Sequence, residues 1–288
     1  MQDNILFYLV FLCQLILVSY YLPSKILARM RHVVTHYPPS EYPKLYPQDV
    51  GCYKKSHRRY QLLNHFLLLV GLLLIAGDVW RSHTYGGGVN ESFPVMFGMV
   101  QFMPMMWLEL SEFGQMKLMR KVNANTQRKA ELSRRRLFDH VSPALIFAVV
   151  ALFFATIVLD LYWNDFKLVW GGDTVVRAFT LFVCNGLFVL IVRFNLHGKK
   201  LNPHQSYEDR SRQVEMVSRT LAYLSLVMSL FFIYTAAGDV YELKAYEHVM
   251  MSVYFQIIAL ISIGNIIWGQ PLEKLNFDVY KADVSVNK

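Results

Sequence analysis

Charged residues are scarce in this sequence. Asp, Glu, Lys and Arg make up 17% of its 288 residues, against about 25% in an ordinary soluble protein. Hydrophobic residues make up 54%, and the excess lies in long blocks, which excludes a soluble globular enzyme and a disordered chain. With only three cysteines, a disulfide scaffold is also excluded. What remains is a polytopic membrane protein whose net charge of +8 needs an explanation.

The common catalytic motifs are missing as well. We find no His-Glu-x-x-His, Gly-x-Ser-x-Gly, Gly-x-x-x-x-Gly-Lys or Gly-x-Gly-x-x-Gly sequence, so neither an enzyme nor a cofactor is predicted. Of nine histidines, only His65 falls clearly within an apolar segment, which leaves no pair of haem ligands. The methionines between Met96 and Met106 are spread around a helix without Cys or His nearby, so they predict packing rather than a metal site.

Seven segments are long and apolar enough to cross a membrane, for which about 20 residues suffice. They are Ile5–Pro23, Gln61–Trp80, Phe93–Glu112, Ser142–Trp163, Thr174–Phe194, Arg219–Val240 and His248–Trp268. We therefore predict an all-α membrane protein with seven transmembrane helices. Because Met1–Asn4 has no positive charge and no small-residue cleavage site follows, the first helix is expected to remain as an anchor.

Basic residues indicate the orientation. Twenty-five of the 29 Lys and Arg residues fall in the connections after the first, third, fifth and seventh segments. Such residues resist translocation, so the N-terminus is predicted outside and the C-terminus in the cytoplasm of a cell membrane, the inner membrane in a bacterium. The net charge is then about +13 inside and −5 outside. This difference in charge reflects how the chain is inserted into the membrane, so no nucleic-acid partner is predicted.

An internal repeat is suggested by two recurring sequences. Asp-aromatic endings centred on Asp78, Asp160 and Asp239 close the second, fourth and sixth segments, and Lys-x-Asn sequences follow the third, fifth and seventh. We predict a leading helix (1–24), a cytoplasmic segment (25–60), three parallel hairpins (61–123, 134–202 and 211–276) and a tail (277–288). The hairpins would suit a pseudo-threefold arrangement.

The polar residues within or beside the spans are few, and each has two interpretations. Asp78, Asp160 and Asp239 would form an acidic outer vestibule for cations, or would be solvated at the headgroups beside interfacial aromatic residues. Glu109, Asn185 and Gln256 would line a path. Alternatively, Glu109 would be an interfacial acid neutralised by the basic loop that follows, and Asn185 and Gln256 would bond between helices.

The cytoplasmic segment has its own organisation. Lys25–His36 is predicted to be an amphipathic surface helix, with Ile26 and Leu27 toward lipid and Arg29 and Arg31 toward anionic headgroups. A Tyr-Pro strap follows, containing Tyr37, Tyr42 and Tyr46. It would dock a protein partner, cover the protein's own cytoplasmic mouth, or serve as a connector at the interface.

Neither side has room for a separate catalytic domain, so function must use the bundle or its loops. The leading hypothesis is a channel or transporter for a small solute or cation. The alternative is a non-catalytic partner, sensor or assembly factor acting through the basic loops.

Overall fold

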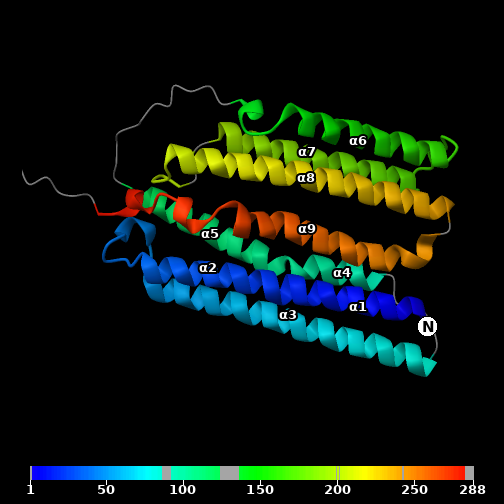
Figure 1. Cartoon of the computed structure of the whole chain (residues 1–288), viewed down its shortest axis with the longest axis horizontal. Helices are drawn as coiled ribbons and strands as arrows, with labels where there is room; N and C mark the ends of the chain where they lie inside the picture. The colour runs from blue at the N-terminus through cyan, green and yellow to red at the C-terminus, as the bar shows by residue number, and fades with distance from the viewer. Residues whose placement is uncertain are drawn as a thin grey trace, which may run out of the picture.

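The computed structural model describes residues 2–85, 92–123, 136–198, 200, 202–241 and 243–282. Helices account for 85% of it, and no strand occurs in the described ranges. The helices lie along one long axis and are joined at the two ends of the bundle (Figure 1). Within these ranges, six helices are long and apolar enough to cross a membrane by length and composition. The all-α prediction is confirmed.

The first predicted span and the amphipathic helix form one continuous helix. It comprises α1 (Gln2–Ile16), a π-helical turn (Leu17–Tyr21) and α2 (Leu22–His36). Pro23 does not end it, because proline is tolerated in the first turn after an irregularity, where its missing N–H removes no bond. The helix therefore continues through residue 24, where the boundary between the leading helix and the cytoplasmic segment was predicted. Ile26 and Leu27 do not face lipid but are each 5% exposed, because α2 packs between α3 and α9.

Four other predicted spans correspond to helices with shifted ends. These are α3 (Val50–Tyr85), α7 (Asp173–His197), α8 (Tyr207–Val240) and α9 (Glu247–Gly269). A fifth, α6 (Pro143–Trp163), begins as predicted because the Ser142 hydroxyl accepts a hydrogen bond from the Leu145 amide at 3.3 Å. At 1.5 Å per residue, the 36 residues of α3 extend about 54 Å, well beyond the roughly 30 Å hydrocarbon core.

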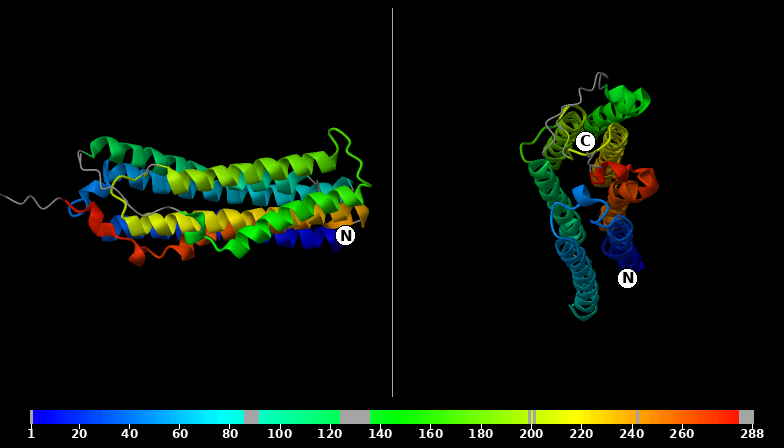
Figure 2. Two further views of the ribbon diagram at one scale, coloured as in Figure 1. Left: turned by 90° about the horizontal axis from the view of Figure 1, so that it is seen from above. Right: turned by 90° about the vertical axis from the view of Figure 1, so that its left-hand side faces the viewer.

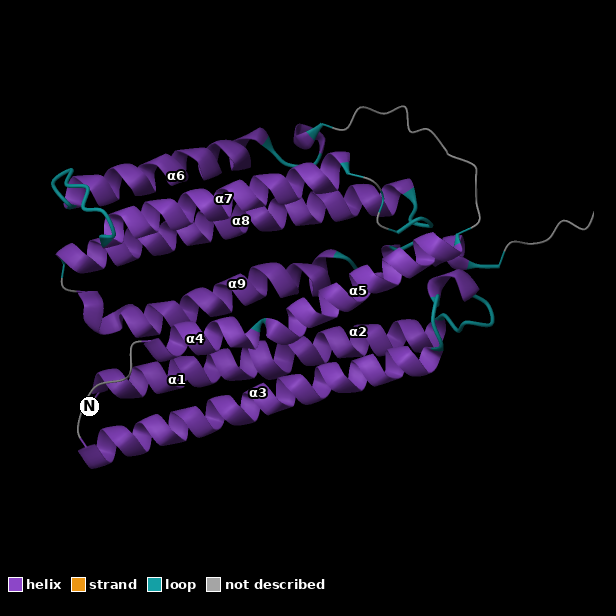
Figure 3. Cartoon of the chain, turned by 180° about the vertical axis from the view of Figure 1, so that it is seen from behind, coloured by secondary structure: helices purple, strands orange, loops and turns teal. Residues whose placement is uncertain are grey.

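The third predicted span is interrupted. It is divided into α4 (Ser92–Gln101) and α5 (Met103–Val122), which lie end to end (Figure 3). Pro104 causes the break, because it lacks an N–H and its ring conflicts with the carbonyl one turn earlier. Phe102 starts a new helix there, accepting a bond from the Met106 amide at 3.1 Å. Helix α4 has only 10 residues, and α5, although it has 20, carries too many charged residues. Neither is therefore among the six helices that are long and apolar enough to cross a membrane.

The hairpins do not surround a common axis. The main core contains Val18 and Leu22 from the first helix, Tyr60 from α3, and Ala259 and Ile263 from α9. From this core the packing continues in a row, in which α9 contacts α8 and α8 contacts α6 and α7. Helices α3 and α6 therefore lie at opposite ends of an elongated cross-section (Figure 2). The pseudo-threefold arrangement is not seen.

Charge separates along the bundle axis. The end at which α2 and α5 finish and α3 and α8 begin carries basic residues such as Lys54, Arg120 and Arg212 and is called the basic end. Arg81, Lys167, Arg177 and Lys244, the basic residues assigned to the outer side, all lie at the opposite end. The tail predicted at 277–288 is described as far as residue 282. Its described part contains a short 3₁₀ turn (Phe277–Tyr280), which lies beside the Tyr-Pro strap.

Candidate functional site

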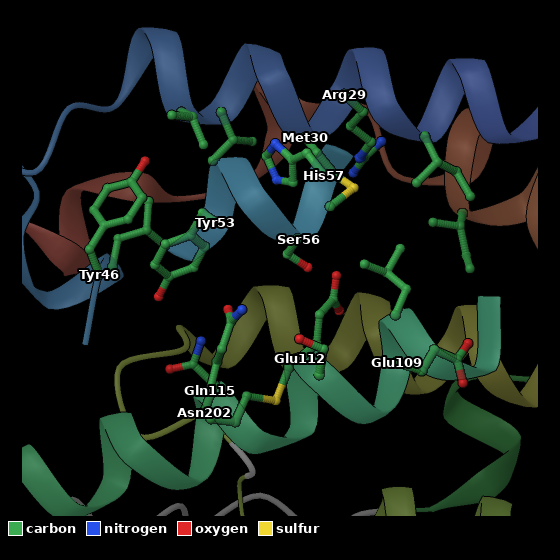
Figure 4. A pocket seen from close by; sticks show the side chains of 18 of the residues that line it. Arg29, Met30, Tyr46, Tyr53, Ser56, His57, Glu109, Glu112, Gln115 and Asn202 are labelled. Carbon is green, nitrogen blue, oxygen red and sulfur yellow. The ribbon is translucent and has the colours of Figure 1, made fainter. Parts of the chain in front are cut away.

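A cavity of about 370 Å³ lies at the basic end between α2, α3 and α5 (Figure 4). Its walls are mostly apolar, with contributions from Ile26, Met30, Met105 and Leu108. The polar residues that line it are Arg29, Tyr46, Ser56, His57, Glu109, Ser111, Glu112, Gln115 and Asn202, together with the phenol of Tyr53. An apolar cavity with a few convergent polar groups is the usual form of a small-molecule site.

Glu112 is the central charged group of this cavity. Its side chain extends from α5 toward α2 and α3, whereas Glu109 points away along α5 (Figure 4). Glu112 makes no hydrogen bond or ion pair with any described residue, although it lies within electrostatic range of Arg29. The Arg29 guanidinium instead donates a long bond, 3.5 Å, to the Ile267 carbonyl. The cavity therefore presents a carboxylate that has no direct partner among the described residues and lies within electrostatic range of Arg29.

The Tyr-Pro strap closes one end of the cavity. Tyr46 lines it, donates to the Tyr37 carbonyl at 2.7 Å and packs edge-on against Tyr53 with ring centroids 5.3 Å apart. Tyr37 stacks on Phe277 at 3.8 Å. This packing against its own chain partly buries Tyr37 and Tyr46, and burial raises the pKa of Tyr46.

Tyr42 and Arg31 lie outside the cavity. Tyr42 packs edge-on against Tyr37 at 5.1 Å, and the Lys281 ammonium lies 5.7 Å from its ring centroid. Arg31 is exposed and donates to Gln61 at 2.9 Å. Of the five cytoplasmic residues predicted to contact lipid or a partner, only Arg29 and Tyr46 line this cavity.

Two walls of the cavity start at irregularities. The helix α2 follows the π-turn, and α5 follows the break at Phe102. A buried network joins the two irregularities, since Gln101 donates to the Ser19 hydroxyl at 2.9 Å and accepts from Gln14 at 2.7 Å. Ser252 of α9 completes the network by donating to Gln14 at 2.5 Å. Interruptions of this kind are frequent at functional sites because they free backbone groups and allow bending.

Two of the three candidate vestibule aspartates are bridged by one arginine. Arg177 donates twice to Asp160, at 2.9 and 3.0 Å, and once to Asp239 at 3.0 Å. Lys244 lies 3.0 Å from Asp239. Asp78 lies elsewhere, where it accepts from Tyr8 at 2.9 Å and pairs with Arg81. The three acids therefore do not gather into one group.

Arg177 is the residue that sequence reasoning missed. It was assigned only as one of four outer cations. Arg177 lies near the start of one predicted span, and Asp160 and Asp239 lie near the ends of two others on the same side of the membrane. This shared depth could have predicted that they pair.

The candidate path residues bond between or within helices. Asn185 donates to the Leu181 carbonyl at 2.9 Å and accepts from Ser225 of α8 at 2.5 Å. Gln256 donates to the Val10 carbonyl at 3.1 Å. Asn185 lies between α7 and α8 and Gln256 between α9 and α1, so the structure does not bring them together.

Within the described residues, no three His, Cys, Asp or Glu side chains are grouped to hold a metal ion. The site must therefore be interpreted from its own chemistry. Comparison with known proteins adds no further constraint: no family model, no curated protein and no solved structure matches this chain.

Proposed function

We propose that this chain is a multi-pass membrane protein that transports a small amphipathic organic cation, which binds in the α2/α3/α5 cavity with its charge beside Glu112. The observation that carries the proposal is the Glu112 carboxylate, which faces a mostly apolar cavity without a hydrogen bond or ion pair to any described residue.

The energetics favour a cationic ligand. An ionised group in apolar surroundings is costly unless it is paired, so Glu112 favours either a proton or a cation beside it. Arg29 lies within electrostatic range of Glu112 but donates to Ile267, which leaves the space between Arg29 and Glu112 for a ligand. The volume of about 370 Å³ lies within the range of roughly 300–1,000 Å³ typical of small-molecule sites. Ile26, Met30 and Leu108 would receive the apolar part of the ligand.

The membrane arrangement belongs to the same proposal. Counting α4 and α5 as one interrupted span gives seven crossings, with the basic end in the cytoplasm because Lys and Arg resist translocation. The repeated Asp-aromatic and Lys-x-Asn sequences would then reflect triplication of a hairpin, in which the three copies have diverged in position. The cavity would open toward the cytoplasm of a cell membrane.

Transport, rather than binding alone, is supported by the interrupted helices. Transporters commonly build their sites from discontinuous helices, whose halves reorient when the ligand binds. Here the π-turn and the break at Phe102 precede two cavity walls and are joined through Gln101 and Ser19. Bending at both interruptions would move α2 and α5 relative to the rest of the bundle.

A fluorescent styryl-methylpyridinium cation provides a direct test. Its emission rises in an apolar site, so titration of the purified full chain measures binding, and counterflow into liposomes measures transport. Glu112→Gln keeps the shape but removes the charge, and we expect at least about tenfold weaker binding and loss of counterflow. The matched control is Glu215→Gln, which neutralises a surface acid that pairs with Arg219 at 2.9 Å and should leave both unchanged.

Two results would overturn the proposal. Equal binding by the wild type and Glu112→Gln would remove the cavity as the cation site. Binding that depends on Glu112 without any counterflow would leave a cation-binding protein and refute transport.

A further inference from the structure

The cavity between α2, α3 and α5 holds a carboxyl group that is placed to carry a proton as well as to pair with a cation. We infer that each organic cation is exchanged for one proton, which is carried by Glu112. This exchange rests on the proposed transport and names the ion that moves in the opposite direction. The titratable or charged residues that line the cavity are Arg29, Tyr46, Tyr53, His57, Glu109 and Glu112.

Glu112 has the best access to protons among these groups. Its side chain is exposed to the cavity and extends toward α2 and α3, whereas Glu109 points away along α5 (Figure 4). His57, on α3, is only 8% exposed. The two tyrosine phenols ordinarily titrate near pH of about 10. Because Glu112 has no hydrogen bond or ion pair with a described residue, it gains or loses a proton without breaking a contact.

The positive charge of Arg29 is stabilised without Glu112. Its guanidinium donates to the Ile267 carbonyl at 3.5 Å, in the last turn of α9. The carbonyl end of a helix favours a nearby cation, because its unpaired C=O groups give it a partial negative charge. Protonation of Glu112 therefore leaves Arg29 with a favourable partner. Both charge states of Glu112 are compatible with the same helix packing.

The charge of the cavity makes the cation and the proton alternatives. When both acids are ionised and His57 is neutral, Arg29, Glu109 and Glu112 give the lining a net charge of −1. Either a bound cation or a proton on Glu112 brings this charge to zero, whereas both together leave a positive charge in mostly apolar surroundings. An uncompensated charge in such surroundings is costly. The favoured states are therefore the cation-bound and the protonated cavity.

The exchange balances in atoms and in charge. On one side of the membrane, the O–H bond of the Glu112 carboxyl breaks, the proton passes to water, and the carboxylate pairs with the cation. On the other side, the cation leaves and Glu112 takes a proton from water there. One positive charge crosses in each direction, so the exchange is electroneutral and the two gradients set its direction.

A transmembrane pH gradient tests this exchange in liposomes that contain the full chain. The styryl-methylpyridinium cation is suitable because its permanent charge prevents passive trapping in an acidic lumen, and valinomycin with equal K⁺ on both sides holds the membrane potential at zero. With a lumen about one pH unit more acidic than the medium, one-for-one exchange should concentrate the cation about tenfold inside. Protein-free liposomes measure the leak. Glu215→Gln, a change at a surface acid that pairs with Arg219 at 2.9 Å, should behave as the wild type.

Proton release on binding assigns the exchange to Glu112. In weakly buffered detergent solution at mildly acidic pH, binding of the cation to the wild type should release protons, which a pH indicator measures. Glu112→Gln, at a saturating cation concentration, should release none. The conservative Glu112→Asp keeps a carboxyl group and should retain release. Release that persists in Glu112→Gln and is lost in His57→Asn or Glu109→Gln would overturn Glu112 as the proton carrier.

The failure of exchange is distinguishable from the failure of transport. Counterflow by the wild type without accumulation in the pH gradient would leave transport in place and overturn the exchange. The absence of both counterflow and accumulation would refute the proposed transport, and the exchange with it. Accumulation by Glu112→Gln equal to that of the wild type would assign the proton to another group and overturn the inference.

Discussion

The ion network at the end opposite the basic end offers the sharpest quantitative prediction. Arg177 has 13% of its side chain exposed and Asp160 has 5%, so the pair is largely withdrawn from solvent. Among the described residues, replacing Arg177 by Gln would leave the Asp160 carboxylate with Thr174, 3.3 Å away, and Asn164, 3.1 Å away. Removing one partner of a buried pair costs about 3–5 kcal/mol, because the other charge is left uncompensated. We therefore expect Arg177→Gln to lower the free energy of unfolding by that amount.

A double-mutant cycle separates the ion pair from a general packing defect. Unfolding in mixed detergent micelles, followed by circular dichroism, is compared for Arg177→Gln, Asp160→Asn and the double variant. The double variant should lose less stability than the sum of the single losses, by roughly 1–3 kcal/mol. As a matched control, Lys167→Gln breaks a pair with Asp165 in which the side chains are 75% and 80% exposed, and it should change stability by at most about 0.5 kcal/mol. Additive losses, or an Arg177 effect no larger than that of the control, would refute the conclusion that the Arg177 ion pairs stabilise the packing of these helices.

The remaining predictions concern packing and buried polar groups, and each is measured by the same unfolding assay. Gly71→Ala should cost about 1–3 kcal/mol, because a Cβ there would lie 2.4 Å from a Leu15 methyl carbon and 2.9 Å from the Phe97 ring. Its control, Gly77→Ala, has nothing within 4 Å of the new Cβ and should be neutral or slightly stabilising. Equal effects of the two changes would contradict the close packing of α3 on α1. Gln101→Leu should cost about 1–3 kcal/mol because it leaves the buried Gln14 amide without its acceptor. A cost below about 0.5 kcal/mol would show that the network does not join the two interruptions.

Local sequence patterns were sufficient to predict most helices. Blocks of about 20 apolar residues must be helical in a membrane, since each backbone N–H and C=O needs an internal partner. The start of α6 was readable from Ser142 and Pro143, which cap and begin a helix by local geometry. The extension of α8 back to Tyr207 was not readable, because its first turns are polar and continue the helix without an apolar block.

The break in the third span shows where local patterns fail. Proline inside a span is compatible with a kinked helix or with two helices, and neighbouring groups decide between them. Here the side chain of Gln101, at the end of α4, bonds to Ser19 and Gln14, and no single segment could reveal these contacts. The burial of Ile26 and Leu27 could not be predicted for a similar reason. An apolar helix face has the same sequence whether lipid or α9 covers it.

What the sequence by itself determined is the all-helical class and the separation of charge between two groups of loops. Hydropathy and charge act on each segment independently, so they can be read without knowing which helices are neighbours. The tertiary structure alone decided that Arg177 joins Asp160 to Asp239, that Glu112 faces Arg29 across a cavity, and that the hairpins lie in a row. Lateral helix order depends on shape and on a few interhelical hydrogen bonds rather than on apolar content, because lipid is as apolar as the helices it surrounds.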